Sequence, residues 1–205
     1  MAATMAAEID GLRSQGHQLT AVASRNPATG RAFAARHRVA NVHSGAADLA
    51  ADADVDAVYI ATPHSVHADE MLACVRSGKA VLCEKPFTLD AASAERVIDA
   101  ARTRGVFVME AMWTRFLPAL AALRAAIAAN EIGDVRVLVG GGAFVPELPP
   151  GHYLLDRSLG GGVLLDAGVY LVSLASMILG APTAVHAVGR IGTHGVDEQD
   201  AIVLE

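Results

Sequence analysis

The heptapeptide Ala-Val-Leu-Cys-Glu-Lys-Pro at residues 80–86 decides how the rest of the chain is interpreted. An apolar run that ends in charged residues and a turn signal is typical of a buried strand in a parallel sheet. Pro86 lacks an N–H and restricts Lys85 to extended geometry, so the predicted strand ends here. Open α/β sheets bind ligands at the carboxyl ends of their strands. The residues alone leave two interpretations open: a ligand-binding Lys85, or a strand end whose Lys85 and Glu84 are solvated.

Predicted strands and helices alternate on both sides of this heptapeptide. Such alternation indicates βαβ units, and therefore an α/β fold with a doubly wound parallel sheet. Besides the heptapeptide, the predicted strands cover residues 19–23, 55–61 and 106–109, and the predicted helices cover residues 2–14, 29–37, 46–49, 68–77 and a segment that Asp90 caps.

The pattern changes after Pro118, which fits the first turn of a helix. We place a domain boundary near Asn130, so that residues 1–130 form the doubly wound domain and residues 131–205 begin an α+β domain. Further predicted elements are a strand over residues 135–145, a Pro- and Gly-rich loop over 146–162, a helix over 166–179, and strands over 184–191 and 201–205.

Composition narrows the functional classes. A chain of 205 residues with a net charge of −6 has no basic footprint, so we expect no nucleic-acid partner. Cys74 and Cys83 lack CxxC spacing and predict free thiols in a reducing compartment. The first residues lack a basic leader, and no apolar run is long enough to span a membrane, so we expect a cytoplasmic protein with no membrane partner.

Asp166 and Tyr170 lie four positions apart on a predicted helix, so their side chains share one face. The phenol can donate or accept a proton, and the carboxylate can orient a hydroxyl group. The alternative is that Tyr170 packs in an apolar helix with its hydroxyl group bound to an ordinary partner. Residue chemistry alone leaves both possibilities open.

Three segments, residues 81–86, 107–116 and 160–170, follow one another in an order and spacing that resemble the glucose–fructose oxidoreductase/inositol dehydrogenase (Gfo/Idh/MocA) family. Within that family the chain is most similar to the branch of dihydrodiol and D-xylose dehydrogenases. The resemblance extends over essentially the whole chain. It implies a Rossmann-type domain followed by an α+β substrate domain.

The resemblance also implies an activity, which is hydride transfer between the nicotinamide C4 of NAD(P) and a hydroxyl or carbonyl carbon of a sugar or dihydrodiol. Tyr170 would be the general acid/base, at a position where many family members have histidine. Lys85 would polarise the substrate oxygen and favour the ionised form of Tyr170. Asp166 would orient the substrate or the base.

The family pattern implies further contacts with the cofactor. Glu84 would position Lys85 or the ribose, and Pro86 would form a tight, often cis, turn beside the nicotinamide. The loop contacting the ribose would contain Thr62, Pro63 and His64, with His67 opening the next helix. Two histidines without a carboxylate or thiol do not complete a metal site, so none is expected.

The predicted strand over residues 19–23 is followed by Ser24 and Arg25 rather than by an acidic residue. A carboxylate at this place binds the ribose hydroxyl groups of NAD, whereas a hydroxyl and a guanidinium suit the 2′-phosphate of NADP. The sequence therefore predicts NADP as the preferred cofactor, with NAD as the alternative.

Trp113 and Arg115 resemble a segment of the substrate pocket in this branch. For Trp113 the alternative is ordinary packing between domains. The resemblance further implies a small-molecule substrate and a homo-oligomer formed through the sheet of the second domain.

The family's first strand and Gly-rich phosphate loop are not found ahead of residue 2, and strand-like sequence continues up to Glu205. We therefore expect an incomplete domain at each end, with a gap, or a direct pairing, between the strands over residues 19–23 and 55–61. Unpaired edges invite aggregation, so this chain expressed alone should be poorly soluble and should not bind NADPH.

The alternatives to an enzyme are a non-catalytic binding protein that retains the fold and a protein that binds a sugar without turnover. Titration with NADPH separates the enzyme from both alternatives, because only the enzyme is expected to bind the cofactor and reduce a carbonyl group.

Overall fold

The computed structural model describes residues 1–205, which divide into two compact units. Unit 1 contains Met1–Thr62 and Val66–Glu110, and unit 2 contains Pro63–Ser65 and Ala111–Glu205. The division after Glu110 lies ahead of Asn130, where the sequence analysis places a domain boundary.

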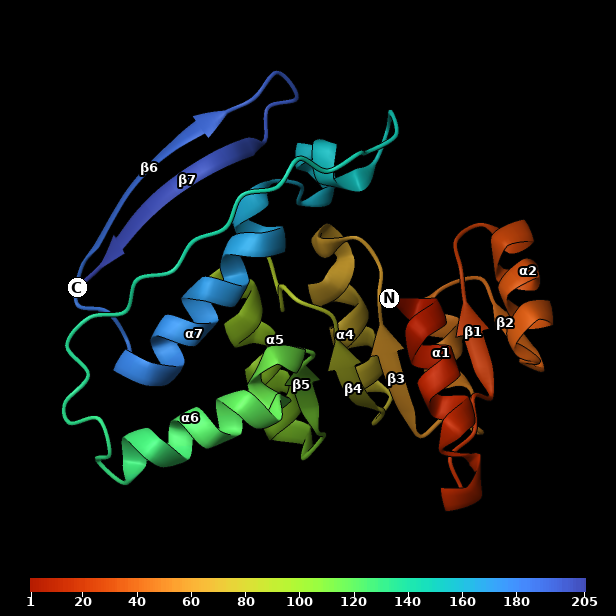
Figure 1. The fold of residues 1–205 in the computed structure, drawn as a ribbon. Coiled ribbons are helices and arrows are strands. Elements are labelled where there is room, and N and C mark those ends of the chain that lie inside the picture. Colours follow the sequence, from red (N-terminus) through yellow and green to blue (C-terminus); the bar gives the residue numbers. More distant parts are fainter. The chain divides into compact units, whose positions relative to one another are not determined.

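Unit 1 is built on parallel strands that form two separate sheets (Figure 1). The first sheet pairs β1 (Ala21–Ala23) with β2 (Asn41–His43), and the second has the order β3 (Ala57–Ile60), β4 (Ala80–Cys83), β5 (Val108–Glu110). The α/β class with a parallel sheet is thus confirmed. The strand β2 was not predicted from the sequence.

The helices of unit 1 begin and end where local chemistry favours it. The side chain of Asn26 accepts hydrogen bonds from the backbone N–H groups of Ala28 and Thr29 at 2.9 and 3.3 Å, which caps α2. Asp90 caps α5 in the same way, and Gly105, at φ 64°, ends it. The helices are α1 (Ala2–Gly11), α2 (Pro27–His37), α3 (Ala46–Ala51), α4 (His67–Arg76) and α5 (Ala91–Arg104), with the short 3₁₀ turn η1 (Arg13–Gln15). A second short turn, η2 (His64–Val66), includes His64 and Ser65 of unit 2.

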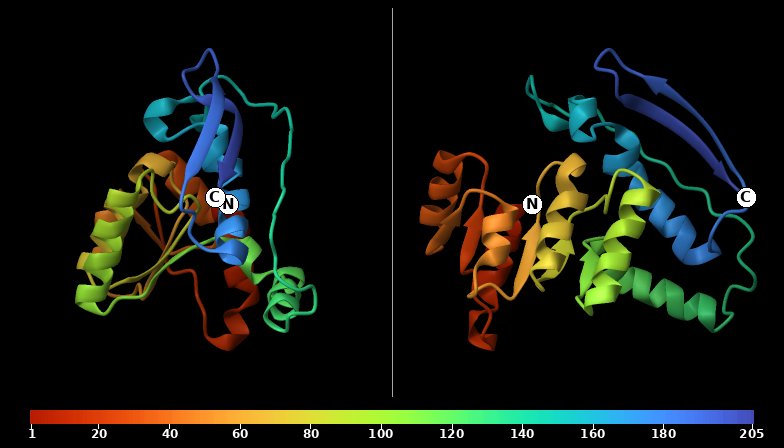
Figure 2. Two further views of the ribbon diagram at one scale, coloured as in Figure 1. Left: turned by 90° about the vertical axis from the view of Figure 1, so that its left-hand side faces the viewer. Right: turned by 180° about the vertical axis from the view of Figure 1, so that it is seen from behind.

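The hydrophobic core of unit 1 centres on α4, which packs against β3 and β4 of the second sheet and has α3 and α5 as neighbours, whereas α3 also packs against β1 and β2. In Figure 2, α4 and α5 lie on one face of the strands and α1 lies on the other. Cys74 and Cys83 are buried in this core as free thiols, as predicted. Burial, with a smaller effect of the Glu70 charge, raises the pKa of Cys74 to about 11. Both thiols are therefore structural rather than reactive.

The predicted gap between the strands over residues 19–23 and 55–61 is confirmed, because no ladder joins β1 to β3. Side chains make the connection instead. Ala21 and Ala23 pack against the core cluster, and the hydroxyl group of Thr20 donates to the carbonyl oxygen of Asp54 at 3.5 Å.

Unit 2 contains two longer helices and an antiparallel ribbon of two strands, seen as a curved blue pair in Figure 2. The ribbon pairs Val185 with Leu204 at one end, and its register shifts between Arg190 and Ile191. The elements are η3 (Trp113–Phe116), α6 (Pro118–Ala128), η4 (Tyr153–Leu155), η5 (Arg157–Leu159), the π-helical turn η6 (Leu164–Gly168), α7 (Val169–Leu179), β6 (Val185–Ile191) and β7 (Asp197–Leu204).

Two expectations for unit 2 are wrong. Residues 135–145 form no strand, because the segment has no ladder partner, and Val139 and Val145 are 89% and 95% exposed. The expected lack of a span-length apolar run is also wrong, since the helical segment Arg157–Leu179 is long enough to cross a membrane and contains an 18-residue window with a mean hydropathy of 1.9. Core helices of soluble proteins share this length and composition.

Candidate active site

Glu84, Lys85 and Pro86 lie at the carboxyl end of β4. The Lys85–Pro86 peptide bond is cis, as the family pattern implies. Glu84 is buried, and its Oε1 accepts a hydrogen bond from the hydroxyl group of Tyr59. Burial and then this hydrogen bond raise the pKa of Tyr59 above its ordinary value. The other oxygen of Glu84, Oε2, is buried and has no hydrogen-bond partner.

His67 joins the loops that follow β3 and β4. Its Nε2 lies 3.0 Å from the carbonyl oxygen of Thr62, and its Nδ1 lies 2.9 Å from that of Pro86. The hydroxyl group of Thr62 donates to Glu70 at 2.7 Å, which fixes the first loop on α4. The fully buried His67 thus holds the backbone at the carboxyl edge of the sheet.

Ser24 and Arg25 follow β1, at the carboxyl end of the first sheet. The Oγ of Ser24 accepts from the backbone N–H of Asn26 at 3.3 Å, and Arg25 is exposed. Gly30 allows Ser24 to lie close to α2, because a Cβ on Gly30 would be 3.2 Å from the Cβ of Ser24.

Unit 2 brings together four of its polar side chains. Trp113 donates from Nε1 to the hydroxyl oxygen of Tyr170 at 3.1 Å, and the two rings meet edge to face with centroids 6.0 Å apart. Arg115 donates to the Oγ and the carbonyl oxygen of Ser173 at 2.9 and 3.1 Å. The η3 segment is therefore hydrogen-bonded to α7 at Tyr170 and Ser173, which lie about one helical turn apart. Asp166 lies in the π-helical turn ahead of α7.

His64 belongs to unit 2 and is buried there. Its Nδ1 lies 2.8 Å from the carbonyl oxygen of Gly160, and its ring meets that of Tyr153 edge to face at 5.4 Å. These contacts give His64 a role in holding the glycine run, residues 160–162, a role that was not predicted from the sequence.

Gly161 and Gly162 lie so close to neighbouring atoms that no other residue fits at these positions. A Cβ on Gly161 would lie 2.4 Å from the carbonyl oxygen of Leu154, and one on Gly162 would lie 2.0 Å from Oδ1 of Asp197. Asp197 was missed in the sequence analysis. Its hydrogen bond to the backbone N–H of Leu164 joins positions far apart in the chain, and no local pattern signals such a contact.

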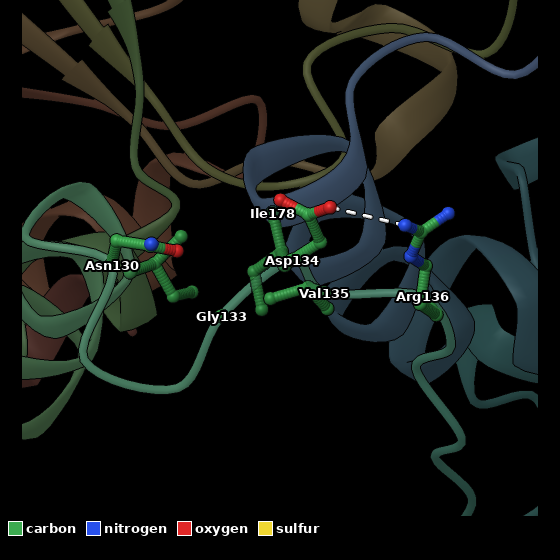
Figure 3. Close-up of a pocket in the computed structure, with 7 residues that line it drawn as sticks. Asn130, Gly133, Asp134, Val135, Arg136 and Ile178 are labelled. Atoms are coloured by element: carbon green, nitrogen blue, oxygen red, sulfur yellow. Dashed lines mark hydrogen bonds and ion pairs between the residues drawn. The ribbon is translucent and has the colours of Figure 1, made fainter.

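A pocket of about 390 Å³ elsewhere in unit 2 lies beside the end of α6 (Figure 3). Asn130, Gly133 and Val135 line it, together with Ile178 from α7. Its charged pair, Asp134 and Arg136 at 3.0 Å, is solvent-exposed, and none of the predicted site residues lines it. No group of three or more His, Cys, Asp or Glu side chains forms a metal site.

Comparisons with known proteins agree with this architecture. A family model described as "Oxidoreductase family, NAD-binding Rossmann fold" matches residues 4–112, and one described as "GFO/IDH/MocA C-terminal domain" matches residues 120–205. A trans-1,2-dihydrobenzene-1,2-diol dehydrogenase from Bos taurus is 40% identical over 191 residues, which are 92% of this chain and 56% of that relative. The chain thus spans little more than half of the relative's length.

Two solved structures are similar as well. The 3-ketoreductase KijD10 from Actinomadura kijaniata, in complex with NADP and TDP-benzene, is 34% identical with a TM-score of 0.70, over 84% of this chain and 52% of that one. Levoglucosan dehydrogenase in complex with NADH is 25% identical with a TM-score of 0.79, over 91% and 54%. The matches span both units, and the chain belongs to the Gfo/Idh/MocA oxidoreductase family.

Proposed function

We propose that the protein is an NAD(P)-dependent dehydrogenase that acts on a hydroxyl or carbonyl carbon of a sugar or dihydrodiol. The observation that carries the proposal is the carboxyl end of β4, where a buried Glu84, Lys85 and a cis Pro86 follow one another at the edge of a parallel sheet. Ligands of open α/β sheets bind at this edge. The names of the relatives support the substrate class.

The residues at this edge fit a nucleotide cofactor. Glu84 Oε2 is buried and lacks a partner, and a ribose hydroxyl group would supply the missing donor. Thr62 and His67 hold the adjoining backbone, so the loop positions are fixed before a ligand arrives. When bound, the nicotinamide supplies the hydride donor or acceptor.

The chain's own residues would transfer the proton and bind the substrate oxygen. In this proposal Tyr170 exchanges a proton with the reacting oxygen, Lys85 polarises that oxygen, and Asp166 orients the substrate or Tyr170. Trp113 and Arg115 contribute to the substrate pocket, and their contacts with Tyr170 and Ser173 support that role.

The preferred cofactor is proposed to be NADP. Arg25 is exposed at the end of β1, no acidic side chain follows that strand directly, and a guanidinium binds a phosphate through two parallel hydrogen bonds. In Arg25→Ala, kcat/KM for NADPH should fall by about 10-fold or more, the loss of one charge-assisted contact, whereas that for NADH should change little. Arg31→Ala, on the helix that follows, is the matched control. Equal efficiency with the two cofactors, unchanged in Arg25→Ala, would exclude the preference.

No observation favours the alternative raised from the sequence, a binding protein that retains the fold without turnover. Titration with NADPH in the presence of a sugar or a dicarbonyl compound separates the two, because only the enzyme oxidises the cofactor and reduces the carbonyl group. Loss of absorbance at the wavelength of the reduced nicotinamide is the measurement. Binding without oxidation, for every carbonyl offered, would favour the binding protein.

We further propose a cytoplasmic homo-oligomer that associates through the ribbon of β6 and β7. Val185, Val188 and Val203 on these strands are more than half exposed, and an uncovered apolar ribbon favours association.

A further inference from the structure

We propose that Asp197 is a positioning residue that fixes the helical run carrying Asp166 and Tyr170, an inference that rests on the role proposed for Tyr170. Asp197 is the first residue of β7. Its Oδ2 accepts a hydrogen bond from the backbone N–H of Leu164 at 2.6 Å. A carboxylate from a distant strand thus binds the first turn of the helical run.

The helical run needs such a partner because it has no cap of its own. Val163 precedes η6 and Gly168 precedes α7, and neither supplies a side-chain hydrogen bond to the helix. The first N–H groups of a helix have no partner within the helix, and a negative charge at this end is favourable. Asp197 meets both requirements.

The chain is shaped to bring this carboxylate to the helix. Gly162 has a φ of 120°, and a Cβ there would lie 2.0 Å from Oδ1 of Asp197, so only glycine leaves room for the contact. On β7, Glu198 is an extra residue opposite the step from Arg190 to Ile191, since Gln199 and Asp197 are the paired positions. Bulges of this kind redirect neighbouring side chains.

A second carboxyl group, that of Asp200, lies near Asp197. Partial burial, followed by the hydrogen bond with Asp197 and its charge, raises the pKa of Asp200. The contacts that restrain Asp197 are its hydrogen bond with Leu164 and the close approach of Gly162.

The single tryptophan of the chain reports the position of the helical run without any need for activity. Trp113 donates to the hydroxyl group of Tyr170 at 3.1 Å, so a shift of α7 changes the surroundings of its indole. If Asp197 fixes this helix, Trp113 emission and turnover should change together when Asp197 is altered.

The experiment compares Asp197→Ala, Asp197→Asn and the control Glu198→Gln by tryptophan emission and steady-state kinetics. In Asp197→Ala we expect an emission shift and a kcat lower by about 10–100-fold, as for a misplaced catalytic group, with the KM for NADPH nearly unchanged. Asp197→Asn keeps an oxygen acceptor and should restore most of both signals. Glu198→Gln should match the unaltered protein.

Normal emission and normal kcat in Asp197→Ala would overturn the proposal, and so would a folded Asp197→Asn that is as impaired as Asp197→Ala. If Asp197→Ala does not fold, the asparagine variant decides: normal emission supports the anchoring contact, and shifted emission in a folded variant contradicts it. The emission results stand even if Tyr170 proves not to be catalytic. Failure of the anchor and failure of the proposed function are therefore distinguishable.

Discussion

In the complete protein, replacing Tyr170 with phenylalanine should lower kcat by about 10²–10⁴-fold, the usual contribution of a positioned general acid or base. The variant removes only the hydroxyl group, which accepts the hydrogen bond of Trp113 and would exchange a proton with the substrate. Because the ring is kept, α7 should stay folded and the affinity for NADPH should be nearly unchanged. Steady-state kinetics and a fluorescence titration with NADPH measure the two quantities.

The matched control is Tyr153→Phe. It removes a hydroxyl group from the same unit while keeping the ring that meets His64 edge to face. Its turnover should be close to that of the unaltered protein. Normal turnover in Tyr170→Phe would refute the assignment of Tyr170.

Lys85→Met should lower kcat by about 10²–10³-fold, as expected when a group that stabilises developing charge on an oxygen is removed. Steady-state kinetics over a range of pH measure this loss. If Lys85 and Tyr170 act on the same oxygen, the loss in Lys85→Met combined with Tyr170→Phe should be much smaller than the product of the single losses.

Lys79→Met is the control, since Lys79 lies just ahead of the same strand, at its other end, and donates to the carbonyl oxygen of Asp52 at 2.9 Å. It should retain turnover at a small cost in stability. Losses that simply multiply in the double variant would show that Lys85 and Tyr170 act independently.

The alternation of strands and helices in unit 1 was predictable because local chemistry determines it. Asn26 and Asp90 cap the helices they precede through contacts within a few residues, and β4 ends at Cys83, shortly ahead of Pro86. The strand β2 was missed because its three residues, Asn41–His43, include a single apolar side chain. It exists because β1 supplies the hydrogen-bonding partners.

The structure of unit 2 was harder to predict, because it depends on contacts between residues far apart in the sequence. The apolar residues 135–145 have the composition of a strand, but a strand also needs a neighbour, and this requirement cannot be read from composition. The candidate residues Asp166 and Tyr170 were found through their spacing and their resemblance to a family. Asp197 carries no local signal, since its partner Leu164 is 33 positions away.

The break between the two sheets of unit 1 has a consequence for cooperativity. A continuous ladder couples the opening of its strands, whereas β1 and β2 are joined to the other strands by side-chain packing and the bond from Thr20 to Asp54. Proteins open in cooperative segments whose free energies differ with the density of such contacts. β1, β2 and α2 can therefore open as one segment while β3, β4 and β5 remain folded around the buried Met71 and Val97. Opening of this segment would carry Arg25 with it, whereas Lys85, which follows β4, would stay with the folded sheet.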